Sequence, residues 1–180
     1  YDCKFMLLRW RGFPSCLGSA CDSSELFSKF EIAHCESFDR YLNKYNVISV
    51  NMQEFLSQCT CINDMIKLLE RSVLWELLDV YSDVRYFDNT NLARSMQDIY
   101  TEKKCPFVVI IDEWDCIFRE YTTDKAAQEK YLDFLRSFLK DKVYIHLAYM
   151  TGILPIKKYG SHSALNMFTE YSMLDTGDLA

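Results

Sequence analysis

Two adjacent carboxylates directly follow a strongly apolar run in the middle of the chain. The run from Val108 to Ile111 consists of four β-branched residues, and Asp112 and Glu113 come next in the sequence VVIIDEWD. A buried strand that ends in acids can bring carboxylates to a metal ion held by nucleotide phosphates. Asp112 is the candidate for holding Mg²⁺, directly or through water, and Glu113 is the candidate general base that polarises the attacking water. The alternative is a strand that simply ends in solvated acids.

A second polar residue follows another strand-like segment. Residues 143–149 (VYIHLAY) are followed by Met150, Thr151 and Gly152. Because ligands bind at the carboxyl ends of parallel strands, Thr151 could sense a γ-phosphate or orient the water there. A threonine between a strand and a glycine is also common in turns, so a purely structural role of Thr151 in a turn is the alternative. Asp115 either supports the acidic cluster or caps the following segment, and capping is preferred.

The acidic run has the form of a Walker B motif, whose usual partner is a glycine-rich phosphate loop containing GK[ST]. No glycine of this chain is followed by lysine. Arg9, Arg11 and Gly12 in LLRWRGFP are the only candidates for a phosphate-binding element, and Pro14 removes one backbone N–H group that such a loop would supply. We therefore expect residues 1–20 to be a degenerate or aberrant segment without a phosphate loop.

Strand-like and helix-like segments alternate along the rest of the chain. Strand patterns cover residues 46–52, 108–112 and 143–149. Helix patterns run from Asn63 or Asp64 to about residue 80, over about 91–101, and onward from a cap at Thr122 or Thr123. This order predicts an α/β fold with three layers, in which helices cover both faces of a mostly parallel sheet.

Composition narrows the class of protein. With 180 residues and 49% hydrophobic residues, the chain is suited to one domain with a substantial core. No window approaches the roughly 18 apolar residues that a membrane-spanning helix needs. A net charge of −6 disfavours a broad surface for nucleic-acid phosphates. The eight cysteines lack the repeated CxxC spacing of a zinc site and are expected to be unpaired thiols of a cytoplasmic protein.

Four blocks of the sequence resemble the predicted AAA-ATPase-like family of bacterial, often gut-associated proteins. The blocks are CDSSELFSKFEIA, NKYNVISVNMQEFL, IIDEWDCIFREY and AYMTGILPIKKYGSHSALNMFTEYSM, and the resemblance covers residues 21–180. It implies a P-loop NTPase fold, ATP and Mg²⁺ as cofactors, and ATP hydrolysis. It also implies that Asp112 and Glu113 are the Walker B residues and that Thr151 is the polar residue after the next strand. Relatives often carry a fused restriction-nuclease-like domain, and a homo-oligomer is a further expectation.

Family members usually begin with an RRFGK[ST] phosphate loop after a first strand, and the sequence offers no counterpart of either. Two hypotheses follow for residues 21–180. One is a partial ATP-binding and ATP-hydrolysing domain, a fragment that lacks the first strand and Walker A. The other is a catalytically inactive P-loop-like scaffold or protein-interaction module. Neither involves a membrane or direct contact with nucleic acid.

Overall fold

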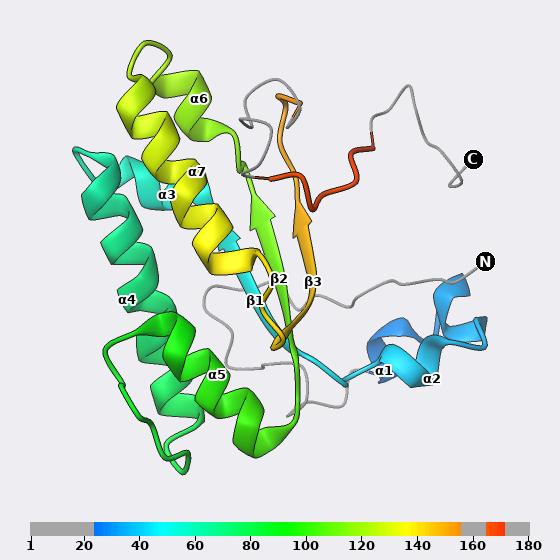
Figure 1. The fold of residues 1–180 in the computed structure, drawn as a ribbon. Coiled ribbons are helices and arrows are strands. Elements are labelled where there is room, and N and C mark those ends of the chain that lie inside the picture. The colour runs from blue at the N-terminus through cyan, green and yellow to red at the C-terminus, as the bar shows by residue number, and fades with distance from the viewer. Residues whose placement is uncertain (1–23, 156–164, 172–180) are drawn as a thin grey trace. The chain divides into compact units, whose positions relative to one another are not determined.

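A three-stranded sheet organises the computed structural model, which describes residues 24–155 and 165–171 (Figure 1). The strands are β1 (Asn46–Asn51), β2 (Phe107–Asp112) and β3 (Ile145–Met150), in the spatial order β1-β2-β3. All three arrows point the same way in Figure 1, so the sheet is parallel. Helices connect successive strands, as parallel pairing requires. The prediction of an α/β fold with a parallel sheet is confirmed.

Short helices precede the sheet and longer ones connect its strands. Before β1 lie α1 (Ser24–Phe27), the 3₁₀ helix η2 (Glu31–His34) and α2 (Phe38–Tyr41). Between β1 and β2 lie α3 (Met52–Ser57), α4 (Ile62–Val80) and α5 (Leu92–Lys103), and between β2 and β3 lie α6 (Cys116–Glu120) and α7 (Lys125–Leu139). Within the described ranges, none of these helices has the length and apolarity needed to span a membrane.

Two of the predicted helix starts are wrong by one to three residues. The helix α4 already includes Asn63 and Asp64, so neither residue caps it. Asp124, and not Thr122 or Thr123, caps α7, because its Oδ1 accepts a hydrogen bond from a backbone N–H of the first turn at 3.0 Å. A side chain must stand directly before the helix to reach these N–H groups, and Asp124 is the residue at that position.

The described residues belong to two compact units. The first comprises the described part of Tyr1–Val50 together with Leu69–Ile111 and Val143–Tyr149. In it, every residue of β2 from Phe107 to Ile111 is buried. This explains why β2 is apolar at each position instead of alternating. Asn46, also buried, accepts a hydrogen bond from Tyr81 Oη at 2.6 Å, so the start of β1 has its polar side chain satisfied.

The second unit comprises Asn51–Leu68 and Asp112–Lys142 together with the described part of Met150–Ala180. Within it α6 packs against both α3 and α7. The rings of Trp114 and Phe118 lie 5.5 Å apart and those of Phe118 and Tyr131 lie 6.3 Å apart. Tyr131 Oη also donates to the backbone oxygen of Trp114 at 2.7 Å. These contacts make α7 the support of the turn that follows β2.

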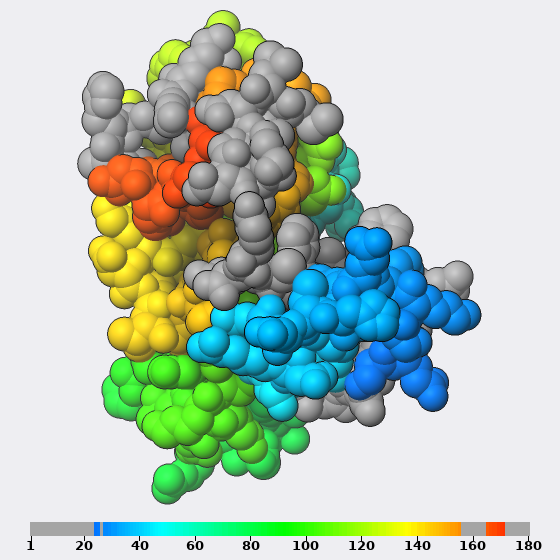
Figure 2. Space-filling view, turned by 90° about the vertical axis from the view of Figure 1, so that its right-hand side faces the viewer, coloured from blue at the N-terminus to red at the C-terminus, as the bar shows by residue number. Residues whose placement is uncertain are grey.

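Residues 165–171 lie beside α7 on the surface seen in Figure 2. Leu165 is buried there, and Lys140 Nζ donates to Asn166 Oδ1 at 3.1 Å. This segment therefore belongs to the second unit through both an apolar and a polar contact.

Candidate functional site

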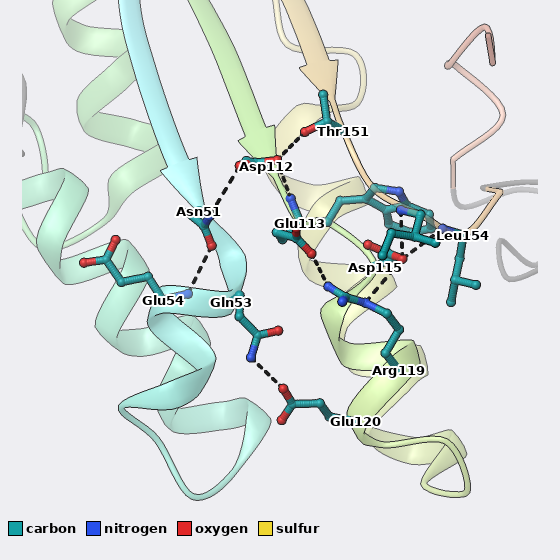
Figure 3. Close-up of polar contacts among 12 residues, drawn as sticks. Asn51, Gln53, Glu54, Asp112, Glu113, Asp115, Arg119, Glu120, Thr151 and Leu154 are labelled. Carbon is teal, nitrogen blue, oxygen red and sulfur yellow. Dashed lines mark hydrogen bonds and ion pairs between the residues drawn. The ribbon is translucent and has the colours of Figure 1, made fainter. Parts of the chain in front are cut away.

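Three hydrogen bonds fix the carboxylate of Asp112, the last residue of β2 (Figure 3). Thr151 Oγ1 donates to Oδ1 at 2.5 Å, and the backbone N–H of Glu113 donates to the same oxygen at 3.0 Å. Asn51 Nδ2 donates to Oδ2 at 3.3 Å. Asp112 is exposed although the rest of its strand is buried. The strand end therefore presents one solvent-facing carboxylate whose orientation is set by its neighbours.

The two carboxylate oxygens of Asp112 differ in the number of acceptor positions that remain unoccupied. A carboxylate oxygen has about two acceptor positions, so Oδ1 is filled by its two donors, whereas Oδ2 has one donor and a position to spare. Mg²⁺ is usually held by one or two carboxylates, several waters and substrate phosphates. Among the described residues, no three His, Cys, Asp or Glu side chains group into a metal cage. The spare acceptor position on Oδ2 is the one that a cation could use.

Thr151 is brought to Asp112, as the strand-end argument predicted. It follows β3 directly, and its hydroxyl donates to the carboxylate. Its backbone oxygen also accepts from the N–H of Trp114 at 3.1 Å, so the chain segments after β2 and β3 are joined by main chain as well as side chain. A hydroxyl that donates to the acid keeps its own oxygen available as an acceptor.

Asn51 contributes to the site although the sequence analysis did not single it out. It ends β1, and its Oδ1 accepts from the N–H of Glu54 at 3.1 Å as the N-cap of α3. Its Nδ2 is thereby directed to Asp112, so one amide caps a helix and orients a carboxylate. The signal was present in the sequence, because Asn51 is a polar residue at a strand end, the property that identified Thr151.

Asp115 occupies the N-cap position of α6, but its side chain makes no capping hydrogen bond, so the capping prediction is wrong. The carboxylate is fully buried, and its Oδ2 accepts from the N–H groups of Ile153 and Leu154 at 3.2 and 2.9 Å. The physical reason is that these loop N–H groups need acceptors, and the Asp115 carboxylate provides one for both. Asp115 thus holds the loop after β3.

Gly152 lies in the same loop, pressed against the turn after β2. A Cβ at this position would lie 2.6 Å from Asp115 Oδ1 and 2.6 Å from Trp114 Cδ1. Both distances are far shorter than van der Waals contact, so a side chain at this position would push the loop away. The absence of a side chain at Gly152 is what allows the loop to reach the acceptor of Asp115.

Glu113 points to a partner that the sequence analysis missed. Its backbone is left-handed, with φ of 55°, and its carboxylate accepts a hydrogen bond from Arg119 Nη2 (Figure 3). Arg119 Nε also lies 3.5 Å from Asp115 Oδ2. Arg119 stands four residues after Asp115 on a helix-like segment, and this spacing could have revealed the pair. Asp112 and Thr151 are therefore in contact, whereas the carboxylate of Glu113 is engaged by an arginine.

The candidate phosphate-binding residues Arg9, Arg11 and Gly12, like all of residues 1–20, lie outside the described residues.

The sequence model of the family described as "Predicted AAA-ATPase" matches residues 16–161, well over half of the chain. No curated protein and no solved structure matches the chain significantly. The match includes all three strands and every residue of the site around Asp112. The chain belongs to the Predicted AAA-ATPase family.

Proposed function

We infer that this chain carries part of an ATP-hydrolysing site, with ATP and Mg²⁺ as its cofactors. The observation that carries the inference is the contact between Asp112 and Thr151, two polar side chains delivered by neighbouring parallel strand ends. Ligands of open parallel sheets bind at this end of the strands. Family membership supports the same class of reaction.

In this proposal each residue has a separate task. Asp112 would hold Mg²⁺ through Oδ2, and the ion would supply positive charge to the nucleotide phosphates. Asn51 and Thr151 keep the carboxylate in place through their hydrogen bonds to its two oxygens. Because its proton is donated to Asp112, the Thr151 oxygen would accept a hydrogen bond from the attacking water and so orient it. Glu113 is the general base that takes a proton from the attacking water.

A second candidate function is a catalytically inactive scaffold or protein-interaction module. One observation favours it, namely that the carboxylate of Glu113 is already paired with Arg119. With Oε2 occupied by the guanidinium, the Glu113 carboxylate has fewer positions left to accept from a water molecule. The sequence also lacks the lysine that normally follows the glycines of a phosphate loop. The two functions differ in whether the chain binds and hydrolyses Mg²⁺-ATP.

Isothermal titration calorimetry of the full chain with Mg²⁺-ATP separates the two. If the proposed function is right, the chain binds Mg²⁺-ATP and Asp112→Ala weakens this binding at least about tenfold. Loss of a residue that only supports a metal ligand already costs this much metal affinity. The matched control is Asp133→Ala, an exposed aspartate of α7 that pairs with Arg136. This variant is expected to bind as the unchanged chain does.

Hydrolysis is then followed by phosphate release. Glu113→Gln is expected to retain Mg²⁺-ATP binding and to lose about 10²-fold or more of the turnover, as expected for a lost general base. If the folded chain binds no Mg²⁺-ATP at millimolar concentration, the proposed function is wrong and the scaffold function is favoured. Equal binding by the Asp112→Ala variant would also contradict the assigned role of Asp112.

A further inference from the structure

Arg119 contacts two carboxylates whose burial differs greatly. Its Nη2 donates to Glu113 Oε2, while its Nε lies 3.5 Å from Asp115 Oδ2. The side chains of Arg119 and Glu113 are 31% and 36% exposed, whereas that of Asp115 is 0% exposed. The guanidinium therefore makes its closer contact with the more solvated of the two acids.

The pairing of Arg119 with Asp115 is incomplete. A separation of 3.5 Å is longer than the roughly 2.7–3.2 Å of a good N–H···O hydrogen bond. Within the part of the chain that the structure describes, Asp115 Oδ1 and Arg119 Nε are both buried and have no hydrogen-bond partner. A buried polar atom that lacks a hydrogen-bond partner is destabilising, even when other atoms of its group are bonded. A rotation that brought these two atoms together would satisfy both.

We propose that Arg119 exchanges between Glu113 and Asp115 and thereby controls whether Glu113 can act on a water molecule. The catalytic part of this statement rests on the role of Glu113 given under the proposed function. With Arg119 on Glu113, the guanidinium occupies carboxylate oxygen Oε2 and holds the side chain aside. With Arg119 on Asp115, the carboxylate of Glu113 is released. Arg119 is a positioning residue, because it acts through the two acids.

The exchange is connected to the loop after β3. Asp115 Oδ2 accepts from the N–H groups of Ile153 and Leu154, so the loop that begins at Thr151 sets the position of the second partner of Arg119. A displacement of this loop changes the reach of Asp115 and with it the balance between the two partners. The Thr151 side of the site and the Glu113 side are therefore coupled through Asp115 and Arg119.

Nuclear magnetic resonance of the full ¹⁵N-labelled chain tests the exchange without any nucleotide. The Arg119 Nε–H signal is assigned by its loss in Arg119→Lys. In Glu113→Gln, which removes the charge of the first partner, Arg119 is expected to move to Asp115. The Nε–H proton then gains an acceptor, its signal moves downfield, and its exchange with solvent slows at least about tenfold. A second variant, Glu113→Asn, fits the left-handed backbone and is too short to reach Arg119.

Two controls come from the same unit. Glu120→Gln removes a charge one residue from Arg119, from a side chain that bonds Gln53 instead, and it is expected to leave the Arg119 signal unchanged. The Nε–H signal of Arg136, which pairs with Asp133, is expected to be the same in all variants. An unchanged Arg119 signal in both Glu113 variants overturns the exchange, because Arg119 would then hold a fixed position.

Turnover distinguishes this inference from the proposed function. If the chain hydrolyses ATP, Arg119→Gln is expected to raise kcat severalfold with little change in KM, since Glu113 is released while nucleotide contacts remain. A fall in kcat to the level of Glu113→Gln would overturn the inferred restraint. If the Arg119 signal moves in Glu113→Gln but the unchanged chain binds no Mg²⁺-ATP, the exchange is supported and only the proposed function fails.

Discussion

Asn51 is expected to stabilise the chain through two separable interactions, and three substitutions separate them. Its Oδ1 caps α3 at 3.1 Å from the N–H of Glu54, and its Nδ2 lies 3.3 Å from Asp112 Oδ2. Asn51→Ala removes both interactions. Asn51→Ser keeps a capping oxygen but does not reach Asp112. Asn51→Asp keeps the cap and places a second carboxylate beside the first.

The magnitudes follow from the geometry. Loss of an N-cap costs about 1 kcal/mol. The hydrogen bond to Asp112 is long and partly solvated, so about 0.5 kcal/mol is expected, the low end for such bonds. Asn51→Ser should therefore lose about 0.5 kcal/mol and Asn51→Ala about 1.5 kcal/mol. Two carboxylates about 4 Å apart near water repel by about 1 kcal/mol, so Asn51→Asp should also lose about 1.5 kcal/mol.

Thermal denaturation followed by circular dichroism measures these losses. For a chain of this size about 1 kcal/mol corresponds to about 2–4 °C in Tm, so Asn51→Ala should lower Tm by about 3–6 °C. Salt distinguishes the two larger effects, because about 1 M salt shortens the screening length to about 3 Å and should remove most of the charge repulsion in Asn51→Asp. The loss in Asn51→Ala should persist. Equal losses for serine and alanine, or a salt-independent loss for aspartate, would refute this account.

The remaining predictions concern the second unit. Tyr131→Phe removes a buried hydroxyl that donates to the Trp114 backbone oxygen at 2.7 Å. We expect the free energy of unfolding, measured by chemical denaturation, to fall by about 1–2 kcal/mol. The control Tyr149→Phe, at an exposed position, should change it little. Asp124→Ala removes the cap of α7 and should cost about 1 kcal/mol by the same measurement. Burial raises the pKa of the Cys116 thiol to about 12, so this thiol should resist alkylation at pH 8 until the chain is denatured. Because the folded thiol keeps its proton longer than the unfolded thiol, its contribution to stability should be lost as pH rises from about 9 toward 12.

The sheet was predictable because its signals are local. Each strand is an apolar run, and the helices between them show their own periodicity, so the parallel order followed from alternation. Asp112 and Thr151 could be paired from the sequence because they stand at the ends of strands that finish at the same edge of the sheet. The same rule selects Asn51, a polar residue at the end of β1 that carries no carboxylate and belongs to no recognised motif.

The contact of Glu113 with Arg119 and the inward direction of the Asp115 side chain could not be predicted in this way. They depend on the left-handed backbone of Glu113. Glutamate rarely adopts this conformation, so the residue type does not predict it. That turn, together with the approach of the loop after β3, sends Asp115 inward to two backbone N–H groups instead of to its own helix. Tertiary contact, and not local propensity, decides which acid is buried and which is paired.

The tight approach at Gly152 has a consequence for how relatives of this chain can vary. The space that a Cβ would need is filled by atoms of Trp114 and Asp115, so these three positions share one volume. A relative with a side chain at position 152 must carry a smaller residue than tryptophan at 114, a different residue than aspartate at 115, or a loop that runs elsewhere. Substitutions at the three positions are therefore expected to occur together. In a relative in which Gly152 alone is replaced, the loop after β3 should no longer pack against the turn after β2.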